Sequence, residues 1–501
     1  MNINNLTIEE KIGQMLCFAH QGTDYHLQLK TLIEDYHIGN IIHFAHNITS
    51  IEQLKTLNQT IQNKSKYPVF ISLDQEGGMV RRITDQITYL PGAMSLAATG
   101  ENIYKITKLC AEDLKQLGIC INYAPVADIN TNPNNPVINS RSFGDEINEV
   151  SKLVNQAFKA IQDAFVLPTV KHFPGHGDTN VDSHLGLPVV DKTKNELLQG
   201  ELVPYLQAIS NGLEGIMVAH ILYTELDENY PSTLSYNIIT KLLKEELGFK
   251  GLITTDSLTM KAIWGRYSIK EIVKRGILAG NDILVFCGGL GLEDQKNIYQ
   301  TFLELVCNNE IPLKRIDESV EKIINLKNKY CSKPKIKNLS RGNKLAQSLI
   351  DKSITKVYDE ELLPLKEEDK VLVIFPKIHL ASLVDNENNQ YETLGKFLGC
   401  EEIIIDNLMN NYENIIQNQA KYDKIILATY NVSAHDYASI LYGQLDKEKI
   451  IHVALRSPYD LRYIKNTKTA ICTYDCTKET LRSLSIKLKT NKFSGTLPVK
   501  I

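Results

Sequence analysis

The residues best suited to chemistry crowd into one short segment of the chain. Residues 171–188 read KHFPGHGDTNVDSHLGLP, so histidine, aspartate and lysine alternate with glycine and proline. This composition interrupts regular structure and predicts a long polar loop, and such loops on rigid scaffolds usually carry function. One candidate chemistry is metal binding by His172, His176, Asp182 and His184. No HExxH or comparable spacing is present, so the sequence favours chemistry without a metal.

Further polar side chains stand at the ends of short apolar runs that predict strands. Five runs carry them at or near their carboxyl ends: Asp74, Asp128, Lys171 with His172, His220, and Asp256. In a parallel barrel these ends share one rim, where active sites form. Helix capping could explain one such residue, but five at one rim predict a shared site.

Asp256 has two possible roles from its position alone. It ends the run ITTD and precedes Ser-Leu-Thr-Met. A carboxylate there could cap the N-terminus of a following helix. It could also project into a cleft as a nucleophile, the group that traps an oxocarbenium-like centre as a covalent ester in glycoside cleavage. The position leaves both roles open.

Strands and helices alternate over the first 330 residues. The predicted strands are 14–18, 40–45, 69–74, 119–124, 167–172, 215–220, 251–256 and 282–286. Helices are expected between most of them, including 101–117, 147–165, 193–212 and 238–247. This rhythm predicts an α/β fold with a (β/α)8-type TIM barrel over residues 1–330. An open doubly wound sheet fits the same rhythm, because periodicity cannot show closure.

A second α/β pattern follows a break in the rhythm. Residues 331–340 carry proline and several lysines, so we expect a linker over 331–345. Predicted strands then follow at 371–376, 401–406, 424–430, 450–455 and 469–474. These indicate a C-terminal domain over 346–501, an α/β sandwich smaller than the barrel with a mainly parallel sheet.

The composition of the chain limits the kinds of partner that the protein is expected to bind. The chain has 501 residues and a net charge of -4, which gives no nucleic-acid or membrane footprint, so a small molecule in a pocket is expected. Its nine cysteines are scattered without CxxC pairs, which favours reduced thiols over disulfides or zinc. The N-terminus reads as a helix capped by Thr7, with Glu9 and Glu10 in its first turn, rather than as a signal peptide. We therefore expect a cytoplasmic protein, unless a signal has been removed.

Several motifs together resemble the family-three glycoside hydrolases, in their β-N-acetylglucosaminidase branch. The most specific is KHFPGHGDTNVDSH at 171–184. The others keep the family's order: DQEGGMVRR at 74–82, APVADINTNPNNPVINSRSFGD at 124–145, MVAHILY at 217–223, ITTDSLTM at 253–260 and FSGTLPV at 493–499. The resemblance therefore covers essentially the whole chain.

The resemblance implies a role for each matched residue. It makes Asp256 the nucleophile and His184 the general acid/base, with Asp182 as the partner of His184. The positions matching those that hold sugar hydroxyls are Asp74, Arg82, Arg141, Lys171 and His172. Asp128 and His220 are expected to shape the same subsite, and His176 is expected to be structural.

The implied activity is that of a retaining exo-β-N-acetylglucosaminidase acting on muropeptide or chitin-type oligosaccharides, with no cofactor or metal. A phosphorylase or β-glucosidase of the same family is the alternative, and an inactive sugar-binding protein is a third. The DSH loop argues against a β-glucosidase, and the joint presence of Asp256, Asp182 and His184 argues against loss of activity.

Two expectations concern His184 itself. An imidazole base is neutral and would not repel an anionic acceptor, so phosphate could replace water. The glycine-rich loop also predicts that His184 lies away from the sugar site when no ligand is bound.

Overall fold

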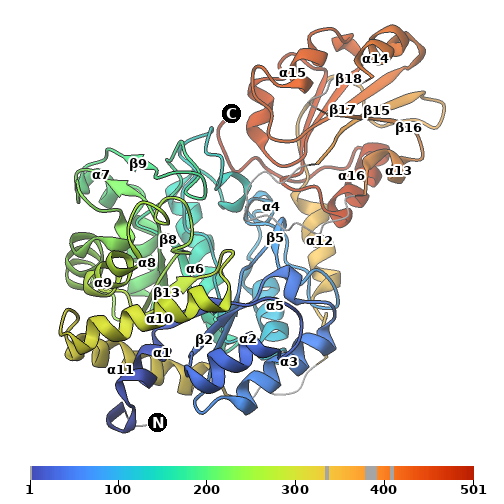
Figure 1. Ribbon diagram of the computed structural model, residues 1–501. Helices are drawn as coiled ribbons and strands as arrows, with labels where there is room; N and C mark the ends of the chain where they lie inside the picture. The colour runs from blue at the N-terminus through green and yellow to red at the C-terminus, as the bar shows by residue number, and fades with distance from the viewer. Residues whose placement is uncertain (1–2, 333–337, 379–391, 407–410) are drawn as a thin grey trace.

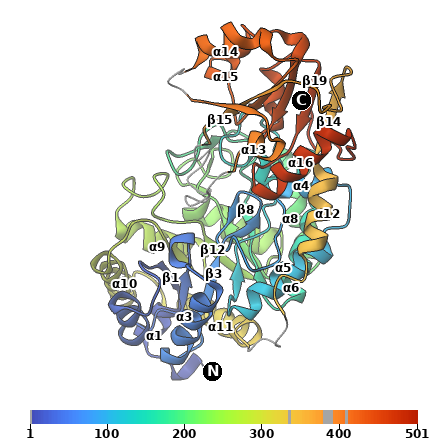
Figure 2. The ribbon, with the colours of Figure 1, turned by 90° about the vertical axis from the view of Figure 1, so that its right-hand side faces the viewer.

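The structure is a computed structural model that describes residues 3–332, 338–378, 392–406 and 411–501. It is an α/β fold in which mainly parallel strands alternate with helices. Figures 1 and 2 show two parts, one holding the chain from the N-terminus to α11 and the other holding the strands from β14 onward. The predicted α/β class is therefore confirmed.

The first part contains two large parallel sheets, besides a two-stranded parallel sheet of β9 Val189–Val190 and β11 Leu222–Tyr223. A six-stranded sheet has the order β13-β1-β2-β3-β6-β7, with β1 Leu16–Ala19, β2 Asn40–Ile42, β3 Phe70–Leu73, β6 Ile121–Asn122, β7 Leu167–Pro168 and β13 Leu284–Phe286. A three-stranded sheet has the order β12-β10-β8, with β8 Val170–Phe173, β10 Gly215–Val218 and β12 Leu252–Thr255. Every predicted strand of this part is present, although the run 167–172 divides into β7 and β8.

Helices surround these strands (Figures 1 and 2). They are α1 Ile8–Gln14, α2 Leu27–Lys30, α3 Ile51–Lys64, α4 Ala93–Ala98, α5 Tyr104–Gln116, α6 Ile147–Asp163, α7 Lys194–Gln199, α8 Val203–Ser210, α9 Ile269–Ala279, α10 Leu292–Cys307 and α11 Leu313–Tyr330. The helix predicted at 193–212 is wrong as one element, because Gly200 ends α7 and a new helix starts with Pro204 in its first turn. The helix predicted at 238–247 is the π-helix η6, Asn237–Glu246. Thr7 caps α1 as predicted, and Glu10 completes a capping box.

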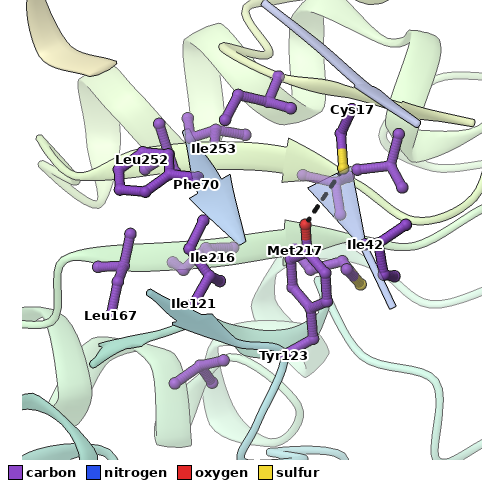
Figure 3. Close-up of a cluster of buried hydrophobic side chains, with 14 of the residues drawn as sticks. Cys17, Ile42, Phe70, Ile121, Tyr123, Leu167, Ile216, Met217, Leu252 and Ile253 are labelled. Atoms are coloured by element: carbon purple, nitrogen blue, oxygen red, sulfur yellow. Dashed lines mark hydrogen bonds between the residues drawn. The ribbon is translucent and has the colours of Figure 1, made fainter. Parts of the chain in front are cut away.

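Apolar side chains from many strands meet inside the first part (Figure 3). Labelled residues come from β1, β2, β3, β6, β7, β10 and β12: Cys17, Ile42, Phe70, Ile121, Leu167, Ile216 and Leu252. All are essentially buried. Each fully buried aliphatic or aromatic side chain stabilises the fold by about 1.5–3 kcal/mol relative to exposure. This shared core fixes the strands whose carboxyl ends carry the polar residues.

The second part is built on a six-stranded sheet of order β14-β19-β18-β17-β15-β16. Its strands are β14 Thr355–Asp359, β15 Val371–Pro376, β16 Glu401–Ile405, β17 Lys424–Thr429, β18 Ile450–Ala454 and β19 Thr469–Cys472. Its helices are α12 Asn343–Ser353, α13 Leu394–Leu398, α14 Tyr412–Asn418, α15 Tyr437–Tyr442 and α16 Lys478–Thr490. Alternate residues of β15 and β17 belong to two separate apolar clusters, so both faces of the sheet are covered.

Two features of this second part differ from the prediction. The edge strand β14 pairs antiparallel with β19 and was not predicted, because only its first residue is buried and its apolar pattern is weak. The predicted linker 331–345 lies partly outside the described residues, and α12 already begins within it at Asn343.

Loops of the second part lie against the rim of the first. Nδ2 of Asn130 bonds Oη of Tyr459 at 3.0 Å, and Nδ2 of Asn139 bonds Oγ of Ser457 at 3.0 Å. Asn130 and Asn139 follow β6, while Ser457 and Tyr459 follow β18. The carboxyl end of the second sheet therefore borders the rim that holds the polar residues.

Candidate active site

Charged side chains from three separate segments form one network at the rim. Nζ of Lys171, in β8, lies 2.8 Å from Oδ1 of Asp74 and 2.7 Å from Oε1 of Glu76. Nη2 of Arg82 lies 3.1 Å from Oδ2 of Asp74. Arg141 holds Glu76 with two bonds of 2.8 Å, one from Nε and one from Nη2. The structure thus brings four of the predicted sugar-binding residues together.

Neighbouring groups of opposite charge keep the members of this network ionised. Burial alone would raise the pKa values of Asp74 and Glu76, but the nearby cations hold both below their usual range. Burial alone would lower the pKa of Lys171, but Asp74 and Glu76 raise it. A buried network that stays ionised offers both strong donors and strong acceptors, which suits the hydroxyls of a sugar.

Glu76 is a member of this network that the sequence analysis did not single out. It lies in the short strand β4, Gln75–Gly77, which pairs with β5, Val80–Arg81. Side chains two residues apart on extended chain point to the same side, so Glu76 faces the same network as Asp74. The D-x-E spacing directly after a strand was the signal that could have found it.

Asp128 fixes the position of His172. Its Oδ2 lies 2.7 Å from Nδ1 of His172, and its Oδ1 accepts the backbone N–H groups of His172 and His176 at 3.3 and 2.6 Å. Burial would raise the pKa of Asp128, but His172 and His176 lower it. Nδ1–H of His172 therefore donates a hydrogen bond to the Asp128 carboxylate. Among the described residues, Nε2 of His172 makes no hydrogen bond and is left for a ligand.

His176 anchors the loop from inside. Nδ1 of His176 lies 2.7 Å from Oγ1 of Thr179, and Nε2 lies 3.1 Å from Oγ of Ser183. Burial and His172 lower the pKa of His176 to about 4, so its ring is neutral. Gly177 packs so closely on the carbonyl oxygen of Ile129 that a Cβ would lie 1.7 Å from it. These contacts agree with the expected structural role of His176.

Asp182 and His184 form a bonded pair further along the loop. Oδ1 of Asp182 lies 2.7 Å from Nδ1 of His184 and also accepts the backbone N–H of His184 at 2.9 Å. Burial would raise the pKa of Asp182, but its bond with His184 lowers it. Nδ1–H of His184 therefore donates a hydrogen bond to the Asp182 carboxylate. This leaves Nε2 of His184 as the nitrogen that can exchange a proton.

Asp256 does not cap a helix. The next helix, α9, begins at Ile269 and is capped by Ser268, while Oδ1 of Asp256 accepts the N–H of Ser257 at 2.7 Å. Burial would raise its pKa, but the charges of His172, His220 and His184 lower the pKa to about 2. The capping role is therefore not seen among the described helices, and the role of Asp256 as a nucleophile stays a prediction.

The loop is docked beside the segment that follows Asp256. The N–H of Ala262 donates to the carbonyl of Ser183 at 3.2 Å. In the described part of the chain, His184 and Asp256 share no hydrogen bond. The movement of His184 away from the sugar site stays a prediction.

His220 supports this segment and is wholly buried. Its Nε2 donates to the carbonyl of Ser257 at 2.8 Å, and its Nδ1 lies 2.6 Å from Oγ1 of Thr233. Both ring nitrogens are therefore occupied by protein groups. His220, like Asp128, positions a neighbour rather than presenting a free polar atom to a sugar.

Among the described residues, no helix is both long and apolar enough to cross a membrane. The same residues contain no group of three or more His, Cys, Asp or Glu side chains arranged to hold a metal ion.

Comparisons with known proteins agree with this geometry. The family described as Glycosyl hydrolase family 3 N terminal domain matches residues 7–326. The β-hexosaminidase A of Pseudoalteromonas piscicida is 32% identical over 491 residues, covering 87% of this chain and 82% of that protein. A β-hexosaminidase of Haemophilus influenzae is 32% identical over 257 residues, covering 50% of this chain and 72% of that protein.

A solved structure gives the same answer. The glycoside hydrolase family 3 β-N-acetylglucosaminidase from Paenibacillus sp. str. FPU-7 is 32% identical, with a TM-score of 0.92 and 99% of both chains covered. The chain therefore belongs to glycosyl hydrolase family 3, a family of glycoside hydrolases, and the resemblance drawn from its motifs is confirmed.

Proposed function

We propose that this protein is a retaining exo-β-N-acetylglucosaminidase that removes terminal β-linked N-acetylglucosamine from muropeptide or chitin-type oligosaccharides. The observation that carries the proposal is the placement of Asp256 at the carboxyl end of β12, beside the docked loop in which Oδ1 of Asp182 lies 2.7 Å from Nδ1 of His184. The relatives, a β-hexosaminidase from Pseudoalteromonas piscicida and a β-N-acetylglucosaminidase from Paenibacillus, support the sugar specificity.

The first chemical step forms a covalent sugar ester. The Asp256 carboxylate attacks the anomeric carbon while Nε2–H of His184 protonates the departing glycosidic oxygen. Asp182 stays anionic and stabilises the imidazolium before the proton leaves, as the acid does in a serine triad. The aglycone then departs with the proton from His184.

The second step releases the sugar. Nε2 of His184 takes a proton from water, the water oxygen attacks the anomeric carbon, and the bond to Asp256 breaks. Each step inverts the configuration, so the product keeps the β configuration. An imidazole suits both steps because its unperturbed pKa of about 6.5 lies near neutral pH.

The remaining residues hold the sugar or the groups that act on it. We assign direct contact with hydroxyls to five residues: Asp74, Arg82, Arg141, Lys171 and His172. Glu76 joins them through Lys171 and Arg141. Asp128 and His220 are positioning residues, because their polar atoms are bonded to protein.

We also propose that the two parallel sheets of the first part are one closed (β/α)8 barrel over 1–330, followed by a separate α/β sandwich domain over 346–501. A single residue separates the end of β7 from the start of β8, so the two large sheets are continuous at this point. On the other side, a parallel bridge joins Thr254 of β12 to Ile283, just before β13, which supports closure. An experimental structure in which β12 and β13 stand apart would contradict it.

The central test compares wild type with Asp256→Asn on an aryl N-acetylglucosaminide and an aryl glucoside. We expect wild type to prefer the former and the variant to lose roughly 10⁴-fold or more in kcat. Asp178→Asn is the matched control, because Asp178 is another aspartate of the first part, in the loop that carries His184, and it bonds Lys192 and Thr131 rather than a proposed catalytic group. Unchanged turnover in Asp256→Asn would contradict the mechanism.

The same assay identifies the acceptor and the stereochemistry. Proton NMR should show the β anomer of N-acetylglucosamine as the first product. Equal sugar release with and without phosphate, and no sugar 1-phosphate, is expected of a hydrolase. Formation of sugar 1-phosphate would instead assign phosphate as the acceptor.

A further inference from the structure

Two cysteines meet at the end of the strands opposite the proposed active site. Cys120 directly precedes β6, and Cys331 caps the C-terminus of α11. Sγ of Cys120 lies 3.8 Å from the carbonyl oxygen of Val69, and Sγ of Cys331 lies 3.5 Å from that same oxygen. The two thiols therefore share one carbonyl oxygen as a hydrogen-bond acceptor. Residues distant in sequence thus place two sulfurs side by side.

Two buried lysines surround this thiol pair. Nζ of Lys115 bonds the carbonyl of Tyr330 at 2.5 Å, and Nζ of Lys327 bonds the carbonyl of Gly39 at 2.8 Å. Among the described residues, neither lysine forms an ion pair with a carboxylate. Burial lowers the pKa of Lys327 to about 8 and lowers that of Lys115 as well. Two ammonium groups without carboxylates favour a negative charge on a neighbouring thiol.

The pair therefore gives up a proton more readily than an isolated buried thiol. The neighbouring Cys331 lowers the pKa of Cys120 against the effect of burial, and Lys115 and Lys327 lower it further. Burial and the neighbouring Cys120 raise the pKa of Cys331. By contrast, burial raises the pKa of Cys17 to about 12, although this thiol also touches Tyr123.

We propose that Cys120 and Cys331 are a peroxide-sensitive thiol pair that closes into a disulfide between the amino end of β6 and the C-terminus of α11. The Cys120 thiolate attacks a peroxide oxygen, the O–O bond breaks, and the departing hydroxide takes up a proton as water. Cys331 then attacks the sulfenic sulfur, the S–S bond forms, and the hydroxyl leaves with the Cys331 proton as a second water. Two thiols are oxidised for each hydrogen peroxide reduced.

In this arrangement Cys120 attacks the peroxide, and Cys331 attacks the sulfenic acid that forms on Cys120. Cys120 is buried and is the attacking thiol of the proposal, while Cys331 is partly exposed and gives a small oxidant access to the pair. A disulfide here would close a long loop and restrict the unfolded chain, so it should stabilise the fold. The proposed catalytic residues stand at the opposite ends of the strands, so activity should be retained.

The test oxidises the full-length protein with a small excess of hydrogen peroxide. We expect two titratable thiols to be lost, and non-reducing peptide mapping to join the Cys120 and Cys331 peptides. The thermal midpoint should rise and return when dithiothreitol is added. A disulfide joining other cysteines, or no loss of thiols, would overturn the proposal.

Variants separate the two steps. In Cys331→Ser the sulfenic acid on Cys120 has no resolving thiol, so dimedone should label Cys120 and the midpoint should not rise. Cys307→Ser is the matched control, because Cys307 is exposed and ends the neighbouring helix α10, and it should behave as wild type. Failure of Cys331→Ser to label with dimedone would overturn the assignment of Cys120, and the wild-type peptide map does not depend on either variant folding.

Discussion

Two stretches of one segment, residues 171–176 and residues 181–189, differ in the exposure of their side chains and in the groups that these side chains bond. Lys171 and His172 are 2% and 5% exposed and are tied to carboxylates from other segments. Val181 and Leu185 are 42% and 63% exposed. His184 bonds only Asp182, its near neighbour, among the described residues. One end is built into the rim. The other carries exposed apolar side chains, and Ser183 ties it to neighbouring residues through His176 and the N–H of Ala262.

This difference matches the two tasks proposed for the segment. Groups that hold a sugar work best when their geometry is fixed before binding, because no ordering is then needed. A group that must first protonate a departing aglycone and then activate water needs access to solvent and to a changing partner. We therefore expect changes at the fixed end to alter binding and stability, and changes at the loop end to alter kcat.

Within this segment, the largest expected effect is that of His184→Ala on kcat. Loss of general acid/base catalysis should lower kcat by roughly 10²–10⁴-fold for a poor alkyl leaving group. The loss should be smaller for a nitrophenyl leaving group, which needs little protonation to depart. The thermal midpoint should stay near that of wild type, because the side chain bonds only within its loop. A large fall in the thermal midpoint would show instead that the His184 side chain supports the fold, as the side chains of the fixed end are expected to do.

The next largest effect is expected from Lys171→Met at the fixed end. This change leaves Asp74 and Glu76 without a shared counter-ion, and breaking a buried pair in this way costs about 3–5 kcal/mol of unfolding free energy. Urea unfolding measures this loss, and KM should rise in the same variant. Lys152→Met is the matched control, because its pair with Glu149 is exposed and worth little. Equal stability of the two variants would contradict a built-in binding end.

The sequence predicted this architecture well where the pattern is local. The bounds of β15 match the prediction, and Thr7 caps α1 as expected, because apolar periodicity and capping are read from neighbouring residues. The edge strand β14 was missed because it is half-exposed. The break at Gly200 was missed because the apolar pattern runs on across it.

Contacts between distant residues were harder to predict. The bonds of Asp128 to His172 and His176 join residues more than forty positions apart, and no spacing in the sequence encodes them. Glu76 was overlooked because its role depends on Lys171 and Arg141, which lie on other segments. The position of Asp256 also allowed a capping role, because the sequence does not show that the next helix, α9, begins only at Ile269 and is capped by Ser268.

Asp182→Asn should have a smaller effect than His184→Ala. It removes the charge from a hydrogen bond to His184, and such charge-assisted bonds are worth about 1.5–3 kcal/mol, or roughly 10- to 150-fold in kcat. The neutral amide no longer stabilises the imidazolium, so the basic limb of the pH–rate profile should move to lower pH. KM should change little, because Asp182 is outside the sugar-holding network. An unmoved basic limb would indicate that Asp182 only shapes the loop.

The smallest effect concerns stability in acid. The folded-state pKa values of Asp74, Glu76 and Asp128 lie below their usual range, so these carboxylates bind fewer protons when folded than when unfolded. Their contribution is therefore full above about pH 4, the unfolded value, and is lost as pH falls through the folded pKa values. The free energy of unfolding should decline below pH 4, by at most about 1.4 kcal/mol per pH unit for each group. Glu76→Gln removes one such group, so its decline should be shallower than that of wild type. Parallel curves for the two proteins would mean that the buried network at the fixed end does not control acid stability.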